Sequence, residues 1–126
     1  MNADDISIFT QRLSKNFGTR MAVTDLNITI KSGQLFSLLG TNGAGKTTTI
    51  KMLCCLLKPS AGSASVLGYN VNESPLKIKK MIGVSPQETA IATHLTTKEN
   101  LLLMGGVYGM KKELARNRTK ELMNLT

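Results

Sequence analysis

The N-terminal part of the chain alternates apolar and polar residues. The alternation is mixed over residues 6–15, and it becomes regular where Leu26, Ile28 and Ile30 are separated by polar residues. A period of two predicts strands that bury one face and leave the other in solvent, as antiparallel sheets commonly do. We therefore expect residues 1–33 to form an antiparallel β part.

A different pattern follows, because Leu35–Leu39 is apolar on both faces. A strand buried on both sides is typical of a parallel sheet covered by helices, and Met81–Val84 reads as a second core strand. Between them, Lys46–Leu57 has helical periodicity and ends before Pro59, which cannot continue a helix. The face that this helix is expected to bury consists of Ile50, Leu53, Cys54 and Leu57.

Shorter elements complete the predicted fold, which is of the α/β class. A short strand runs through Val66, and Pro75 stands at the first position of a helix, where proline is favoured. Thr96 and Glu99 have the spacing of a capping box and predict the start of a further helix. A last helix, Lys111–Leu125, is amphipathic, and its inward side chains are expected to be Leu114, Leu122 and Leu125.

Composition limits the class of protein. The chain has 126 residues, 41% hydrophobic and 19% charged, which suits one globular domain or part of one. No apolar run approaches the roughly 18 residues of a membrane span, and the acidic N-terminus is unlike a secretory signal, so a cytoplasmic location is expected. The adjacent Cys54 and Cys55 have neither disulfide nor zinc-ligand spacing and are expected to be reduced thiols.

The net charge of +8 favours anionic partners. The basic residues are dispersed, however, and the chain has only two tyrosines, three phenylalanines and no tryptophan. No stacking platform for single-stranded nucleic acid is apparent, so we read the basic residues as solvated faces and expect no nucleic acid partner.

The strongest chemical signal is GTNGAGKT at residues 40–47, which fits the P-loop pattern G-x-x-x-x-G-K-S/T. Glycines let the backbone turn tightly and approach phosphate oxygens without a Cβ in the way. Amides from Gly43 to Thr48 can point into one concavity at the positive end of the following helix. Lys46 can reach the β- and γ-phosphates, and the Thr47 hydroxyl can ligate Mg²⁺.

The stretch LFSLLGTNGAGKTTTIKMLCCLLKPSAGSASVLGYNV around this loop strongly resembles the ATPase domains of ABC transporters. Phe17 matches the family's aromatic that stacks on adenine. Gln87, in Val-Ser-Pro-Gln-Glu, matches the Q-loop glutamine that helps to place Mg²⁺ and the attacking water. Leu95–Leu101 and the later Gly106–Gly109 are most similar to the ATPases of ABC-2-type exporters.

The resemblance implies a site and a division of the chain. ATP and Mg²⁺ would be the ligands, with Lys46 and Gln87 in catalytic roles and Thr47 and Gln87 at the metal. The nucleotide-binding residues would be Phe17, Asn42, Gly43, Ala44, Gly45, Lys46, Thr47 and Thr48. The chain would consist of the antiparallel β part at 1–33, a P-loop core with the Q-loop at 34–88, and the start of a helical subdomain at 89–126.

The resemblance also implies partners, namely a second ATP-binding domain and a membrane permease, through which this chain would lie on the inner face of the plasma membrane. It covers only the first half of the family's domain, because the printed sequence has no Leu-Ser-Gly-Gly-Gln signature, Walker B carboxylates or switch histidine. The one histidine, His94, reads as an ordinary loop residue. We therefore expect this chain alone to turn ATP over several orders of magnitude more slowly, and to expose apolar surface.

Two functions remain open from the sequence. The chain is either part of the energy-coupling ATPase subunit of an ABC transporter, or a nucleotide-binding module that does not hydrolyse ATP. A basic nucleic-acid binder, whose binding would survive loss of Lys46, is the third and weakest alternative. Neither the transported substrate nor the oligomeric state follows from these residues.

Overall fold

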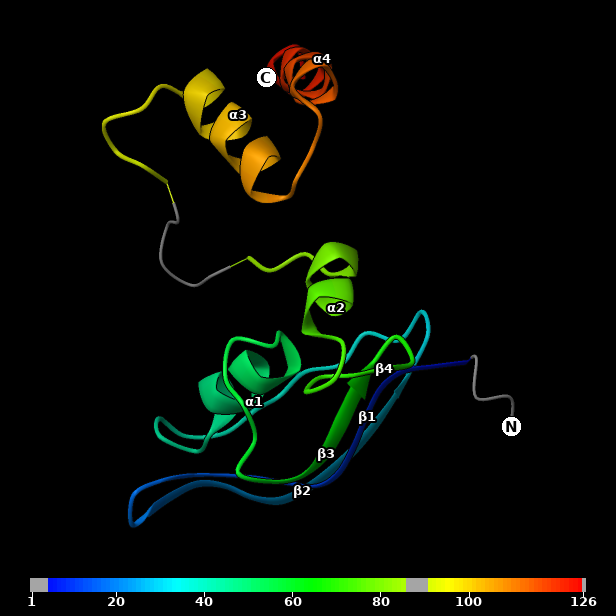
Figure 1. Ribbon diagram of the computed structural model, residues 1–126. Coiled ribbons are helices and arrows are strands. Elements are labelled where there is room, and N and C mark those ends of the chain that lie inside the picture. The colour runs from blue at the N-terminus through cyan, green and yellow to red at the C-terminus, as the bar shows by residue number, and fades with distance from the viewer. Residues whose placement is uncertain (1–4, 86–90, 126) are drawn as a thin grey trace. The chain divides into compact units, whose positions relative to one another are not determined.

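The computed structural model describes residues 5–85 and 91–125. Along the chain the described elements are β1 (Ile6–Phe17), β2 (Arg20–Lys31), α1 (Lys46–Leu53), β3 (Ala61–Val66), β4 (Tyr69–Asn70), α2 (Pro75–Met81), α3 (Thr97–Val107) and α4 (Lys112–Met123) (Figure 1). The chain divides into two compact units, Met1–Val84 and Ser85–Thr126. The first holds the sheet with α1 and α2, and the second holds α3 and α4.

The sheet has the strand order β2-β1-β3-β4, and every pair of neighbouring strands in it is antiparallel. β1 and β2 form a long hairpin that closes where Phe17 pairs with Arg20. Along β2, Val23 and Ile30 are buried while the residues on either side of Ile30 are exposed. The α/β class and the antiparallel β part predicted from the alternation are confirmed.

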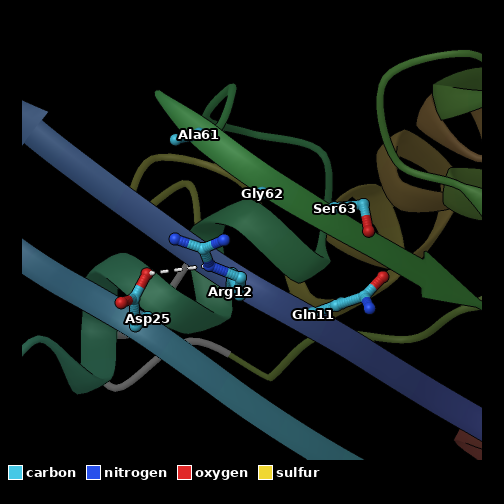
Figure 2. Close-up of a pocket in the computed structure, with 6 residues that line it drawn as sticks. All are labelled: Gln11, Arg12, Asp25, Ala61, Gly62 and Ser63. Atoms are coloured by element: carbon cyan, nitrogen blue, oxygen red, sulfur yellow. Dashed lines mark ion pairs between the residues drawn. The ribbon is translucent and has the colours of Figure 1, made fainter.

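A line of irregularities crosses three strands of the sheet. Arg12 on β1, Asp25 on β2 and Gly62 on β3 all have positive φ, at 50°, 46° and 75°, and the strand registers shift beside them. Figure 2 shows the three residues close together, with Arg12 and Asp25 forming an ion pair at 3.8 Å. Gly62 is required here because a Cβ at that position would lie 2.1 Å from the Arg12 carbonyl oxygen.

Two buried hydroxyls form hydrogen bonds with backbone groups beside these irregularities. Thr10, 1% exposed, donates to the Leu26 carbonyl and accepts from the Ile28 amide, each at 2.9 Å. Ser14 accepts from the Asp25 amide at 2.9 Å. These side chains supply the hydrogen bonds that a regular ladder would otherwise make.

The core of the first unit lies between the sheet and its two helices. Leu13, Met52 and Ile78 have no exposed surface. They come from β1, α1 and α2, so the core joins these elements rather than belonging to one of them. The buried cluster comprises Leu13, Val23, Met52, Ala64, Val66, Val71 and Ile78.

α1 begins at Lys46 as predicted but ends at Leu53, earlier than the predicted Leu57. The Leu56 amide donates to the Lys51 carbonyl at 2.8 Å and the Cys55 amide to that of Met52 at 3.1 Å. Cys55 has φ 58°, so these bonds form a Schellman termination with a cysteine where glycine is usual. A local turn therefore ends the helix before Pro59 can.

The predicted inward face of α1 is only partly right, because Leu53 and Leu57 pack against the core but are not its centre. Thr49 and Met52 are the buried residues, at 3% and 0% exposure, whereas Ile50 is 49% exposed. The shorter helix packs on β2 and β3, and this contact centres the buried face on Thr49 and Met52 and leaves Ile50 outside it.

The two predicted parallel strands are not formed within the described residues. Leu35–Leu39 has no strand pairing, and Leu35 and Leu39 are 98% and 89% exposed. Met81 ends α2, and Ile82–Val84 has no ladder either. An apolar segment becomes a strand only when neighbouring strands satisfy its amides and carbonyls, and the described sheet offers no parallel neighbour to either segment.

In the second unit, α3 begins at the predicted capping box. The Thr96 hydroxyl accepts from the Glu99 amide, and the Glu99 carboxylate accepts from the Thr96 amide at 2.8 Å. The hydrogen bonds from the Thr96 backbone and side chain lower the pKa of the Glu99 carboxyl below its ordinary value. The charged form of Glu99 therefore stabilises the start of this helix.

α4 packs on α3 through small residues, so the inward leucines predicted for it are wrong. Ala115 and Thr119 are the buried residues of α4. Leu114, Leu122 and Leu125 are 57%, 39% and 81% exposed. Gly105 of α3 is buried against Ala115, and the two helices approach too closely there for leucines to enter.

Candidate functional site

The glycine-rich loop at residues 40–45 leads directly into the first turn of α1. Gly45 is the N-cap residue, with φ 85°, and no side chain caps the amides of the first turn. The first turn also contains no acidic residue. A helix N-terminus with free amides and no competing carboxylate is a site for an anion.

Lys46 is held across the mouth of this loop. Its Nζ donates to the Gly40 carbonyl at 2.5 Å and to the Thr41 carbonyl at 2.7 Å. Both acceptors are uncharged backbone oxygens, and no ion pair to Lys46 exists among the described residues. The positive charge is therefore available to an incoming anion, for which these two bonds would be exchanged.

Gly43 and Gly45 give the loop its shape, and both have φ 85°. Their surroundings differ. A Cβ on Gly45 would lie 2.3 Å from the Ala22 carbonyl oxygen of β2, whereas the nearest atom to a Cβ on Gly43 is an Arg20 guanidinium nitrogen at 3.9 Å. The close approach at Gly45 fixes the start of α1 against the hairpin.

The closed end of the β1–β2 hairpin thus adjoins the loop. Arg20 reaches Gly43, and Phe17 is the residue paired with Arg20 across the hairpin. The Phe17 side chain is 51% exposed, and the Lys15 ammonium lies 5.3 Å from its ring centroid. An exposed aromatic ring on the element beside an anion site is suitably placed to stack on a flat ligand group.

Sequence reasoning missed Arg20. A single arginine in a hairpin turn has no motif spacing, and only the packing of the hairpin on the loop reveals it. Its guanidinium adds a second positive charge near Gly43, in the same unit as Lys46. Arg20 could therefore be identified from the tertiary structure but not from a sequence motif.

The other predicted site residues fall into two groups. Asn42, Ala44 and Thr47 are exposed at the loop and the first turn of α1, and Thr48 is half-buried. The Thr47 hydroxyl makes no hydrogen bond within the described part of the chain, which fits an oxygen ligand for a hard divalent cation. Gln87 lies outside the described residues.

A separate hollow of about 260 Å³ lies at the line of irregularities in the sheet, lined by Gln11, Arg12, Asp25, Ala61, Gly62 and Ser63 (Figure 2). It shares no residue with the glycine-rich loop. Its ion pair is largely exposed, and an exposed pair contributes little to stability or binding. We interpret this hollow as a result of the irregular strands around it and not as a binding site.

The cysteines play no part in the site. Cys54 and Cys55 are both free, and burial raises the pKa of each thiol, with Lys79 opposing the effect at Cys55. Thiols with raised pKa values are poor nucleophiles at neutral pH. Over residues 5–85 and 91–125, no cluster of three or more histidine, cysteine, aspartate or glutamate side chains could hold a metal ion.

Comparison with known sequences gives a consistent result. The family model described as ABC transporter matches residues 23–125. Doxorubicin resistance ATP-binding protein DrrA of Mycobacterium tuberculosis is 36% identical over 125 residues, which are 98% of this chain and 38% of that protein. The probable multidrug ABC transporter ATP-binding protein YbhF of Escherichia coli is 42% identical over 104 residues, which are 82% of this chain and 18% of that protein.

Solved structures agree with the sequences. An ATP-binding subunit of an ABC transporter superposes with a TM-score of 0.73 at 28% identity, covering 85% of this chain and 45% of that one. A dimeric post-hydrolysis state of the ATP-binding cassette MJ0796, bound to ADP and Pi, gives 0.72 at 26% identity, with 90% and 54% covered. The predicted P-loop fold is confirmed, and the chain spans about half of each structure or less.

Proposed function

The chain belongs to the ABC transporter family of ATP-binding proteins, and on that premise we propose that it binds the phosphates of Mg·ATP at Gly40–Thr48. The observation that carries this proposal is the Lys46 ammonium, held on two backbone carbonyls beside a helix N-terminus without a cap. Amides of the loop and first turn would surround the phosphates, and Lys46 would neutralise them.

Further residues would complete the site. Phe17 would stack on the base and Arg20 would add charge beside Gly43. Thr47, together with Gln87, would hold Mg²⁺, which neutralises charge on the β- and γ-phosphates when bound. Asn42, Ala44 and Thr48 would contribute loop contacts.

The wider role that we propose is the nucleotide-binding part of an energy-coupling transporter subunit. Its partners would be a membrane permease and a second ATP-binding domain, at the inner face of the plasma membrane. The names of the relatives, which include doxorubicin resistance and multidrug transporter proteins, support an exporter. No helix in the described ranges has the length and apolarity needed to cross a bilayer.

A second candidate is binding without hydrolysis. The 126 residues contain no apolar strand ending in Asp-Glu and no signature sequence. The Asp would help to hold Mg²⁺ and the Glu would polarise the attacking water. Without them we expect this chain to bind ATP and release phosphate no faster than the background.

The test is titration of a fluorescent ATP analogue with Mg²⁺, beside a phosphate-release assay. Lys46→Ala removes a charged hydrogen-bond donor, so we expect binding weaker by about 10- to 100-fold. Lys51→Ala is the matched control, because Lys51 is an exposed lysine on α1 outside the loop. Equal binding by the Lys46 variant would contradict the proposed site, and phosphate release that depends on Lys46 would contradict the non-hydrolytic candidate.

A further inference from the structure

The second unit contains a groove between α3 and α4 that has no part in the nucleotide site. Its volume is about 420 Å³. Lys98 lines it from α3, and the polar residues that line it from α4 are Glu113, Arg116, Asn117, Thr119 and Lys120. The groove is therefore built from one unit only.

The groove carries uncompensated positive charge. Lys98, Arg116 and Lys120 oppose the single carboxylate of Glu113, which leaves a net charge of +2 (three cationic side chains less one carboxylate). None of these four forms an ion pair in the described part of the chain, since α4's own pair joins Arg118 and Glu121. The cationic groups are free to bind an anion.

An almost fully buried polar residue also lines the groove. Thr119 is 3% exposed as a residue, and its hydroxyl makes no hydrogen bond to another described residue. No fully buried side-chain oxygen or nitrogen among those residues lacks a partner, so this hydroxyl is open to the groove rather than enclosed. A helical threonine commonly donates to the carbonyl four residues earlier. The unused Thr119 hydroxyl, together with the Asn117 amide, offers hydrogen bonds to a ligand in the groove.

We propose that this groove binds a phosphate monoester group. Such a group carries a charge of about −1.5 to −2 at neutral pH and three strong acceptor oxygens, which matches the net charge and the number of donors. A carboxylate would leave part of the charge unbalanced. Arg116 can hold two of the oxygens in a fork, and the lysines act as point charges. The ester belongs either to a soluble metabolite or to a lipid headgroup.

The first experiment titrates glycerol 3-phosphate into the full chain carrying Lys46→Ala, so that the P-loop does not compete. Binding is followed by backbone amide shifts in α3 and α4. Lys120→Gln is expected to weaken binding about tenfold, and Glu113→Gln to strengthen it severalfold. Lys112→Gln makes the same change of charge on the same helix outside the groove and is expected to change affinity less than about twofold.

The second experiment distinguishes the two sources of the ester. The same variants are sedimented with phosphatidylcholine vesicles that contain phosphatidate, or phosphatidylserine at equal surface charge. Binding to phosphatidate vesicles without binding of free glycerol 3-phosphate assigns the ester to a lipid headgroup, and amide shifts with the free ester assign it to a soluble molecule. Equal weakening by Lys120→Gln and Lys112→Gln, equal binding to both vesicle types without free-ester binding, or no binding of either probe would overturn the proposal.

Discussion

Gly43 and Gly45 have the same backbone conformation but different surroundings. Each has φ 85°, which disfavours any residue with a Cβ. Only at Gly45 would a Cβ clash with another element, because it would lie 2.3 Å from a β2 carbonyl oxygen, whereas at Gly43 the nearest atom would be 3.9 Å away. The pair therefore separates the cost of left-handed backbone from the cost of steric contact.

Substitution by alanine tests this separation. Gly43→Ala is expected to lower the free energy of unfolding by about 1–2 kcal/mol, the cost of left-handed backbone alone. Gly45→Ala should lower it by a further ~1–3 kcal/mol, since backbone must move to admit the methyl group. Chemical denaturation of both variants measures the difference, and equal destabilisation would show that α1 does not press on β2.

At the residue scale the sequence was most informative where chemistry depends on local spacing. The loop residues, the start of α1 at Lys46 and the Thr96–Glu99 capping box all follow from neighbours along the chain. Arg20 was missed because its position beside Gly43 depends on how the hairpin packs. The roles of Phe17 and Gln87 stay predictions.

At the scale of elements, α3 and α4 show why leucine spacing misled. The crossing uses Gly105 and Ala115, whose small side chains let two helix backbones approach, and the leucines of α4 lie away from it. Gly105 and Gly106 look alike in sequence as weak points of a helix. Their surroundings differ, because a Cβ on Gly105 would lie 2.9 Å from that of Ala115, whereas one on Gly106 would meet nothing within 4 Å.

The two glycines give opposite expectations for alanine. Gly106→Ala should stabilise the chain by about 0.5–1 kcal/mol, through the higher helix propensity of alanine. Gly105→Ala gains the same propensity but forces the helices apart, and a net destabilisation of roughly 1 kcal/mol is expected. Thermal unfolding followed by circular dichroism measures both, and stabilisation by Gly105→Ala would show that the α3–α4 contact is looser than described.

The strand predictions were right for strands that pair with a neighbour in the described sheet and wrong for the apolar segment that has none. Strands that pair within the chain, such as β1 with β2, were predicted correctly from their alternation. The apolar segment Leu35–Leu39 was predicted as a strand from its composition, but composition cannot supply a neighbour with which to form a ladder. Where pairing is non-local, the pattern alone does not determine the element.

At the scale of the whole molecule, the exposed apolar residues have a measurable effect. Leu35 and Leu39 are almost fully exposed, and such surface favours association. We expect the purified chain to self-associate with increasing concentration, and the double variant Leu35→Lys/Leu39→Lys to shift it toward monomer without lowering its unfolding temperature. Light scattering coupled to size-exclusion chromatography measures the shift.

The control for that prediction is Ser37→Lys, which adds charge to the same exposed segment without removing apolar surface. A similar shift toward monomer in this variant would mean that net charge, rather than the leucines, governs association. A lower unfolding temperature in the double variant would mean that the two leucines are buried in solution.

The line through Arg12, Asp25 and Gly62 has a consequence for misfolding. A hairpin that slipped by one residue would move the irregular positions of β1 and β2 out of line with each other. A one-residue slip of β3 would bring Ala61 or Ser63 to the place where Gly62 approaches the Arg12 carbonyl, and even a Cβ does not fit there. The slipped hairpin would also turn the Thr10 and Ser14 hydroxyls out of reach of the amides they now serve. These features favour one register of the sheet, and we expect hairpins with a shifted register to be less stable and to re-pair.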